Sequence, residues 1–135
     1  MGGAGHARQK RVLVVDDDYF VSDLLLEALT EWGYAVDVAA SARLLARQLE
    51  ISPPDLIILD INLPGMDGTE IGYLLRSNPH TAKIPVLMLS ADRRVEQKAT
   101  RVKTDDWMAK PVDLELLAVK VHRLLALELG EGSGA

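Results

Sequence analysis

Hydrophobic residues recur along the chain in two patterns that alternate. Short runs rich in branched residues predict five strands, at residues 11–15, 34–39, 56–59, 85–89 and 106–109. After each run, apolar residues recur every three or four positions, which predicts helices over about 20–32, 42–49, 70–77, 92–102 and 113–129. Asp18 can cap the first helix, Gly33 can end it, and Ser41 can cap the second. Residues 62–68 are rich in turn formers and predict a loop.

Strands that alternate with helices in this way form a parallel sheet with helices on both faces. We therefore predict one α/β domain over residues 10–129, a single doubly wound five-stranded parallel sheet in the order 2-1-3-4-5 with five helices. The most apolar run, residues 56–59, belongs at the centre of that sheet. Residues 1–9 and 130–135 are expected to be flexible tails.

Polar residues stand directly after three of the predicted strands. Asp16, Asp17 and Asp18 follow the first strand, Asp60 follows the third, and Lys110 follows the fifth. Because the carboxyl ends of parallel strands meet at one edge of a sheet, we expect the acids of the first and third strands to lie side by side there. Carboxylates gathered in this way repel one another unless a cation lies between them. This edge is therefore a predicted site for a divalent cation and a phosphoryl group.

The cation that best suits such a site is Mg²⁺, because it prefers oxygen ligands and commonly shares them with phosphate. Alternatively, one aspartate is a nucleophile that forms an aspartyl-phosphate. Lys110 can hold phosphate oxygens as a point charge. Ser90, at the end of the fourth strand, offers a hydroxyl donor to the same group.

Composition and charge exclude several other classes of protein. The net charge of −5 argues against direct nucleic-acid binding, which needs clustered Lys and Arg. The absence of cysteine excludes disulfides, thiolate metal sites and thiol catalysis. No apolar stretch approaches the roughly 20 residues of a membrane span, and the first residues have no apolar core of a signal peptide. We therefore expect a cytoplasmic protein without membrane contacts.

Five pieces of the chain, in order, resemble the receiver domain of two-component response regulators, the CheY-like family. These pieces are Val14–Asp18, Pro54–Asp60, Asn62–Gly68, Val86–Ala91 and Trp107–Pro111, and the resemblance covers nearly all of residues 10–129. A pair of aspartates after a strand is a weak indication by itself, whereas five pieces at strand ends are specific. The resemblance implies a signalling switch that takes a phosphoryl group from a sensor histidine kinase or a histidine phosphotransfer protein, with Mg²⁺ as cofactor.

The resemblance also implies roles for the acidic residues. Asp60 is implied as the phospho-acceptor and as one metal ligand. Asp17 is implied as a direct Mg²⁺ ligand, with Asp16 binding largely through water. Asn62 would give its backbone carbonyl to the metal. We also expect Asn62 and Asp92 to flank the path of attacking water and so to set the lifetime of the phosphate.

Further roles fall on the fourth and fifth strands. Ser90 is implied to swing toward the phosphate, and Lys110 to bind it. The peptide bond that joins Lys110 to Pro111 is commonly cis in the family. Trp107 is implied as the switch aromatic, buried in one state and exposed in the other, and the alternative is a static packing role.

The family's output face combines the fourth helix, the fifth strand and the fifth helix, where a downstream effector docks. Between Ser90 and Lys110 this chain is short by about half a helical turn, so we expect an altered fourth helix. Its basic residues form either a solvated face or a docking surface for an acidic partner: Arg93, Arg94, Lys98, Arg101 and Lys103.

The last helix carries two apolar stripes. The first is expected to face the sheet and contains Leu117, Val121, Leu124 and Leu125. The second is expected to be partly exposed and contains Leu116, Val119, Leu127 and Leu129. An exposed stripe of this kind would suit a partner or a homodimer.

Two other functions remain open on the sequence. A pseudo-receiver would bind partners without phosphorylation. A haloacid-dehalogenase-like phosphatase also uses Mg²⁺ and an aspartyl nucleophile in an Asp-x-Asp motif, which Asp16–Asp18 satisfies formally, although the hydroxyl-bearing residue expected soon after is missing. The receiver hypothesis makes the chain a phospho-acceptor that catalyses only its own phosphorylation and dephosphorylation, not an enzyme.

Overall fold

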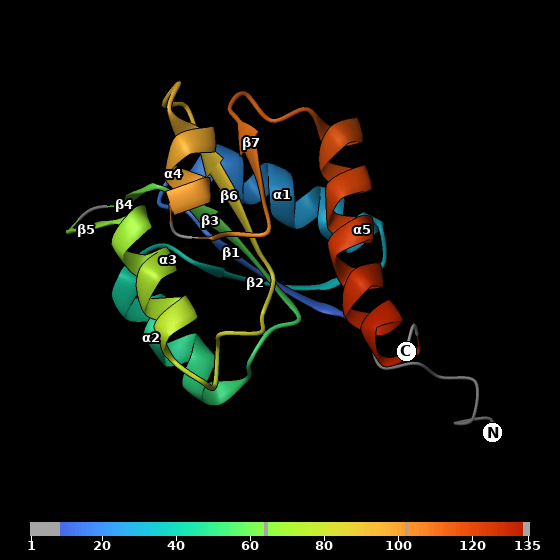
Figure 1. Ribbon diagram of the computed structural model, residues 1–135. Coiled ribbons are helices and arrows are strands. Elements are labelled where there is room, and N and C mark those ends of the chain that lie inside the picture. The colour runs from blue at the N-terminus through green and yellow to red at the C-terminus, as the bar shows by residue number, and fades with distance from the viewer. Residues whose placement is uncertain (1–8, 64, 102, 134–135) are drawn as a thin grey trace.

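A computed structural model describes residues 9–63, 65–101 and 103–133 (Figure 1). The centre of the molecule is a parallel sheet of five strands in the order β2-β1-β3-β6-β7. Its strands are β1 (Arg11–Val15), β2 (Ala35–Ala39), β3 (Leu56–Asp60), β6 (Val86–Ser90) and β7 (Asp106–Ala109). The parallel order, with β3 at the centre, confirms the predicted doubly wound fold.

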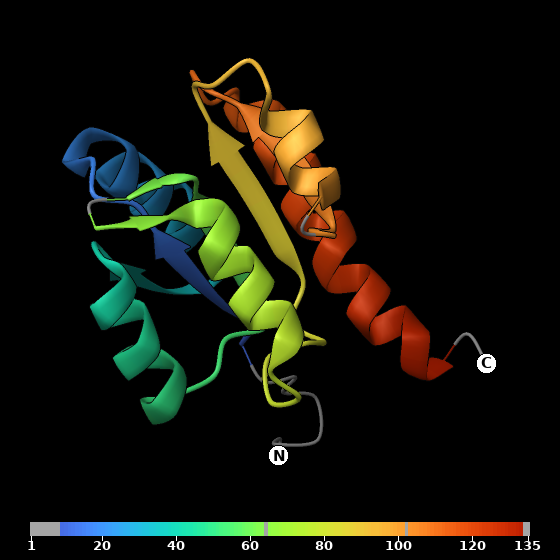
Figure 2. The same ribbon diagram turned by 60° about the vertical axis from the view of Figure 1, so that its left-hand side comes forward.

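Five helices cover the two faces of the sheet. They are α1 (Tyr19–Glu31), α2 (Ala42–Ile51), α3 (Gly68–Ser77), α4 (Val95–Arg101) and α5 (Leu114–Ser133). Helices α1 and α5 pack on one face, whereas α2, α3 and α4 pack on the other (Figures 1 and 2). Within the described residues, no helix is long and apolar enough to cross a membrane.

A hydrophobic core lies on each face of the sheet. Each strand contributes to both cores, because alternate side chains point to opposite faces of a sheet. In β3, Ile58 packs in one cluster with Leu25 of α1 and Leu117 of α5. Its neighbour Ile57 packs in a second cluster with Leu45 of α2. Every residue of β3 is buried, which explains why its sequence is a continuous apolar run rather than an alternating one.

The predicted helix signals act as expected at α1 and α2. The carboxylate of Asp18 accepts the N–H of Phe20 at 2.9 Å and caps α1. The hydroxyl of Ser41 accepts the N–H of Leu44 at 3.2 Å and caps α2. Gly33, just after α1, has φ of 99°, a left-handed conformation that favours glycine and ends the helix.

The segment predicted as a loop after β3 contains a short antiparallel hairpin of β4 (Asn62–Leu63) and β5 (Met66–Asp67). Gly65 has φ of 81°, as the tight turn of the hairpin requires. Helix α3 begins earlier than predicted, because the carboxylate of Asp67 accepts the N–H of Thr69 at 2.8 Å and caps it. Strands of two residues carry no periodic signal, so the sequence pattern could not predict this hairpin.

Helix α4 is shorter than the prediction of residues 92–102. The carboxylate of Asp92 accepts the N–H of Arg94 at 2.8 Å, so the chain makes a turn before the helix begins at Val95. After the helix, Lys103 has φ of 58°, a left-handed conformation that helical residues do not adopt. Local turns at both ends therefore confine the helix to Val95–Arg101, and its departure from the family's pattern stays a prediction.

Helix α5 extends to Ser133, past the predicted end at residue 129. Glycine costs a helix interior only about 1 kcal/mol, so Gly130 and Gly132 do not interrupt it. The segment expected as a flexible tail is therefore helical as far as Ser133. The exposure predicted for Leu127 and Leu129 lies outside the described side chains, and most of the predicted N-terminal tail lies outside the described residues.

Candidate functional site

Three carboxylates gather at the carboxyl edge of the sheet. Asp16 and Asp17 follow β1, Asp60 ends β3, and the three can each present an oxygen within 4.8 Å of the others. The parallel register pairs Val15 with Leu59 and so brings the residues that follow them together. Asp16 and Asp60 are buried, at 1% and 4% exposure, whereas Asp17 is exposed. The predicted meeting of acids from the first and third strands is confirmed.

Backbone N–H groups fix the two buried carboxylates in place. Asp16 Oδ1 accepts the N–H of Asp18 at 2.9 Å. Asp60 Oδ1 accepts the N–H of Asn62 at 3.2 Å. Each bond reaches two residues along the chain, so the turn that follows each strand holds the carboxylate of that strand. The N–H of Asn62 thereby lies beside the carboxylate of Asp60.

Lys110 follows β7 and reaches the same pocket. Its Nζ lies 3.0 Å from Asp16 Oδ2 and 3.4 Å from Asp60 Oδ2. Burial by itself would lower the pKa of Lys110, but the hydrogen bond to Asp16 and the charge of Asp60 outweigh it, and the net pKa is raised. The ammonium group therefore stays charged at neutral pH. The peptide bond from Lys110 to Pro111 is cis.

The pocket holds more negative than positive charge. Burial, followed by the charge of Asp16, raises the pKa of Asp60 from 3.8 to about 6, although the N–H of Asn62 and the charge of Lys110 act in the opposite direction. A hard divalent cation would relieve this repulsion. Carboxylate oxygens from Asp16, Asp17 and Asp60 are the donors that Mg²⁺ prefers, so the residues fit this ion.

Ser90 lies at the same edge and is fully buried, at 0% exposure. Its Oγ accepts the N–H of Asp92 at 2.9 Å, and its backbone carbonyl accepts the N–H of Lys110 at 2.8 Å. The hydroxyl of Ser90 can therefore still donate a hydrogen bond to another acceptor. Its hydroxyl is thus linked directly to the loop that leads from β6 into α4.

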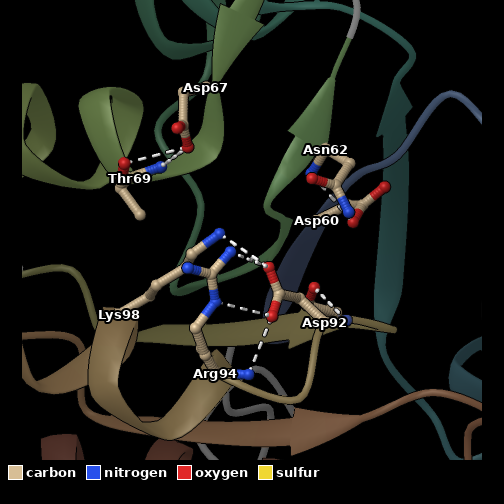
Figure 3. A network of polar contacts seen from close by, with 8 residues as sticks. Asp60, Asn62, Asp67, Thr69, Asp92, Arg94 and Lys98 are labelled. Atoms are coloured by element: carbon tan, nitrogen blue, oxygen red, sulfur yellow. Dashed lines mark hydrogen bonds and ion pairs between the residues drawn. The ribbon is translucent and has the colours of Figure 1, made fainter.

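Asp92 is bound by two cations of that region, as Figure 3 shows. Lys98 Nζ lies 2.8 Å from Asp92 Oδ2, and Arg94 Nε lies 3.4 Å from Asp92 Oδ1. The hydrogen bond from Lys98, with further help from Arg94, holds the pKa of Asp92 well below its usual range. The expectation that Lys98 belongs to a solvated basic face or a docking surface is wrong, since its side chain is only 20% exposed and pairs within the chain.

Trp107 in β7 is half-buried against α4. It packs on a cluster of Ile61, Met88, Val95 and Ala99. The residue before it, Asp106, forms ion pairs with Lys120 at 2.8 Å and with Arg123, both from α5. Trp107 therefore lies where α4 and β7 meet, within the face expected to carry output.

The two predicted stripes of α5 differ in burial as expected. Leu117, Val121, Leu124 and Leu125 have exposures of 0–4% and face the sheet. Leu116 and Val119 are 45% and 61% exposed. This part of α5 therefore presents apolar surface that no described part of the chain covers.

A doubly wound sheet with acids and a lysine at its carboxyl edge defines a CheY-like signalling domain. Residues 12–122 match the response regulator receiver domain, and the chain belongs to that family. Receiver domains of this family are phosphorylated on aspartate by kinases and generally bind Mg²⁺ at an acidic pocket.

Two curated relatives are full-length regulators. The chain is 40% identical over 120 residues to the DNA-binding dual master transcriptional regulator RpaA of Synechocystis sp., an alignment that covers 85% of this chain and 48% of that protein. It is 32% identical over 125 residues to the transcriptional regulatory protein QseB of Escherichia coli O157:H7, covering 91% of this chain and 56% of that protein. The chain thus spans about half the length of these relatives.

Two solved structures match this chain over nearly their whole length. The chemotaxis response regulator CheY4 of Vibrio cholerae is 29% identical with a TM-score of 0.80, and the match covers 87% of this chain and 99% of that one. A CheY-like receiver domain protein of Methanospirillum hungatei is 28% identical with a TM-score of 0.84, covering 92% and 99%.

Proposed function

We propose that Asp60 accepts a phosphoryl group from a sensor histidine kinase or a histidine phosphotransfer protein, and that phosphorylation changes the face formed by α4, β7 and α5. The observation that best supports this is a pair of buried carboxylates, Asp16 and Asp60, that share the ammonium group of Lys110. Phosphoryl transfer depends mainly on positioning and charge neutralisation, and this arrangement offers both.

In the proposed transfer, a deprotonated oxygen of Asp60 bonds to phosphorus as the bond from phosphorus to the donor nitrogen breaks. The electron pair of the broken bond returns to the imidazole of the donor histidine. Lys110, 3.4 Å from Asp60 Oδ2, neutralises charge on the phosphoryl oxygens. Mg²⁺, when held by Asp16, Asp17, Asp60 and the backbone carbonyl of Asn62, supplies further neutralisation.

Ser90 and Trp107 are proposed to carry the signal from the pocket. Because Ser90 Oγ accepts the N–H of Asp92, a turn of this hydroxyl toward the phosphate would pull on the loop before α4. Trp107 packs against α4 and would respond to its movement. Asn62 and Asp92 are proposed to set the lifetime of the phosphate, as residues that stand two positions after Asp60 and Ser90 and on either side of the attack path.

The output partner is proposed to be a protein effector that binds the α4-β7-α5 face. Exposed Leu116 and Val119 supply apolar surface there, which suits either the effector or a second copy of the chain in a homodimer. We place the reaction in the cytoplasm, where the sensor kinases of this family transfer phosphate. The chain is proposed to catalyse its own phosphorylation and dephosphorylation and no other reaction.

The phosphatase alternative would use Asp16 as nucleophile. Both oxygens of Asp16 are engaged, one by the N–H of Asp18 and the other by Lys110. Asp16 is also 1% exposed, so a substrate would have to displace these partners before reaching it. Asp60 is also buried, at 4% exposure, and one of its oxygens accepts the N–H of Asn62. Its other oxygen lies farther from Lys110 than that of Asp16 does, at 3.4 Å against 3.0 Å, and this weaker contact supports Asp60 as the acceptor.

The test is phosphorylation by a small acyl phosphate, with covalent phosphate read by intact mass. The wild-type chain is expected to gain one phosphoryl group with Mg²⁺ and none with a chelator. Asp60→Asn is expected to gain none, whereas Asp16→Asn keeps the acceptor. No phosphate on the wild type would instead support the phosphorylation-independent pseudo-receiver.

A further inference from the structure

Lys98 lies beside the phosphoryl pocket, and the proposed function gives it no role. It projects from the middle of α4, and its Nζ reaches back over the first turn of the helix to Asp92 (Figure 3). The two side chains are 20% and 21% exposed, so the contact is largely shielded from solvent. A shielded ion pair fixes its partners more firmly than an exposed one.

Asp92 makes several of the hydrogen bonds that hold the loop before α4. Its carboxylate accepts the N–H of Arg94 on one oxygen and Lys98 Nζ on the other, both at 2.8 Å. Its own N–H donates to Ser90 Oγ. The side chain of Arg94 contributes less, because it is 69% exposed and its contacts with Asp92 are 3.4 and 3.5 Å long. Lys98 is therefore the principal side chain that restrains the carboxylate.

The same ammonium group also acts on the hairpin after β3. The N–H of Thr69 is the main cause that lowers the pKa of Asp67, and the charge of Lys98 adds to it. Asp67 pairs with Asn62 across the hairpin. Figure 3 shows Lys98 between Asp67 on one side and Asp92 on the other, with Asp60 and Asn62 nearby. Lys98 thus lies at the junction of the two loops that carry Asn62 and Asp92.

The pairing of Asp92 with Lys98 matters because the neighbouring pocket is already rich in negative charge. Asp16, Asp17 and Asp60 already outnumber Lys110, so a further unpaired carboxylate at the edge would repel an incoming phosphodonor. A carboxylate released from Lys98 would also be a free acceptor for a water molecule near Asp60. Held in its ion pair, Asp92 does neither.

We propose that Lys98 is a positioning residue for phosphate lifetime: it restrains the carboxylate of Asp92 away from the water that attacks phosphorylated Asp60. This rests on the proposed function. In the hydrolysis, a water oxygen bonds to phosphorus as the bond from phosphorus to the Asp60 oxygen breaks. The electron pair returns to the Asp60 carboxylate, one water proton passes to an acceptor, and hydrogen phosphate leaves. A freed Asp92 serves as that acceptor or orients the water, and the reaction accelerates.

The experiment follows the loss of phosphate after the acyl phosphate donor is removed, at fixed Mg²⁺, by intact mass. Lys98→Met is expected to lose phosphate roughly three- to tenfold faster than the wild type, since the gain from one loosely positioned base lies below that of a fully positioned one. Lys98→Arg is expected to restore the wild-type rate, because it keeps the ion pair. Arg101→Met, which removes an exposed cation from the same helix, is the matched control and is expected to change nothing.

A double-mutant cycle separates this role from a structural one. In an Asp92→Asn background, Lys98→Met is expected to have no further effect on the rate. An acceleration that persists in that background, or equal rates for wild type and Lys98→Met, would overturn the inference and leave the acceptor role of Asp60 intact. Failure of the wild type to take phosphate would overturn the proposed function and this inference together.

Discussion

The ammonium nitrogen of Lys110 lies 3.0 Å from a carboxylate oxygen of Asp16, although 94 positions separate the two residues in the chain. Strands β1 and β7 do not pair directly, so the contact spans the carboxyl edge of the sheet between them. Asp60, on β3, joins the same ammonium group at 3.4 Å. One lysine therefore balances the two buried acids, and much of the chemistry of the pocket depends on it.

Lys110→Met is expected to slow phosphorylation of Asp60 by roughly 10²-fold, the loss typical when one group that stabilises transition-state charge is removed. The pKa of Asp60 is expected to rise further above about 6, since the charge of Lys110 now lowers it. Carbon-13 NMR titration of the aspartate carboxyls and a phosphorylation time course would measure the two effects. Lys83→Met, at an exposed lysine outside the pocket, is the control and should change neither.

The raised pKa of Asp60 makes the metal-free chain less stable as pH rises. Its pKa is 3.8 when unfolded and about 6 when folded, so the destabilisation is absent below pH 3.8 and complete above pH 6. Asp60→Asn is therefore expected to raise the free energy of unfolding above pH 6 by on the order of 1–3 kcal/mol, and to lose this advantage as pH falls toward 4.

Urea unfolding with a chelator, at a series of pH values, would measure this difference. Asp23→Asn, on the exposed surface of α1, is the matched control. Mg²⁺ is expected to stabilise the wild type more than Asp60→Asn, because the metal replaces the proton as the counter-charge. A difference between wild type and Asp60→Asn that did not vary with pH would refute the assignment of the shift to Asp60.

Gly68 lies against the turn that follows Asp60. A Cβ at this position would lie 2.7 Å from the carbonyl oxygens of Asp60 and Ile61, which are backbone atoms that can move only if the turn itself shifts. Gly68→Ala is expected to cost about 1–3 kcal/mol of stability and to weaken Mg²⁺ binding, because the turn must shift. Thermal unfolding and Mg²⁺ titration by calorimetry would check both.

Gly33→Ala is the control for this effect. Its Cβ meets no atom within 4 Å, so its cost comes from the left-handed φ of 99°. It is expected to lower stability with no change in Mg²⁺ affinity. Equal Mg²⁺ affinities for both variants would contradict the link between Gly68 and the pocket.

Asp106 forms ion pairs with two cations that differ in exposure, Lys120 and Arg123. Lys120 is 18% exposed and lies 2.8 Å from Asp106, whereas Arg123 is 56% exposed. Lys120→Met is expected to lower the free energy of unfolding by about 1.5–3 kcal/mol, as for a shielded charged hydrogen bond. Arg123→Met is expected to cost less than about 1 kcal/mol. Urea unfolding of both variants at low and at high salt would measure the contrast, and the reverse order would refute it.

Much of the fold could be predicted from the sequence, because it depends on local pattern. The run at residues 56–59 had to be a central strand, since only burial on both faces suits four consecutive branched residues. The caps at Ser41 and Asp18 follow from short polar side chains that reach nearby N–H groups. The meeting of Asp16 with Asp60 follows from parallel strands, whose carboxyl ends share one edge.

Other features were missed because they depend on contacts that have no local signal. The hairpin of β4 and β5 is too short to show a period. The early start of α3 and the late start of α4 depend on whether Asp67 and Asp92 cap a helix or close a turn. The pairing of Lys98 with Asp92 could have been suspected from an acid in the loop and a lysine six positions later, but that spacing also occurs on solvated helices.

The sequence by itself determined the alternation of strands and helices, the sheet order and the residues at the strand ends. Periodicity and turn chemistry act over a few neighbouring residues, so they can be recognised without coordinates. Only the tertiary structure decided which charges are paired and how deeply. Lys110 contacts two buried acids because distant segments pack together, and the turn before α4 brings Asp92 within reach of Lys98. Burial then sets how strongly each charge acts on the next.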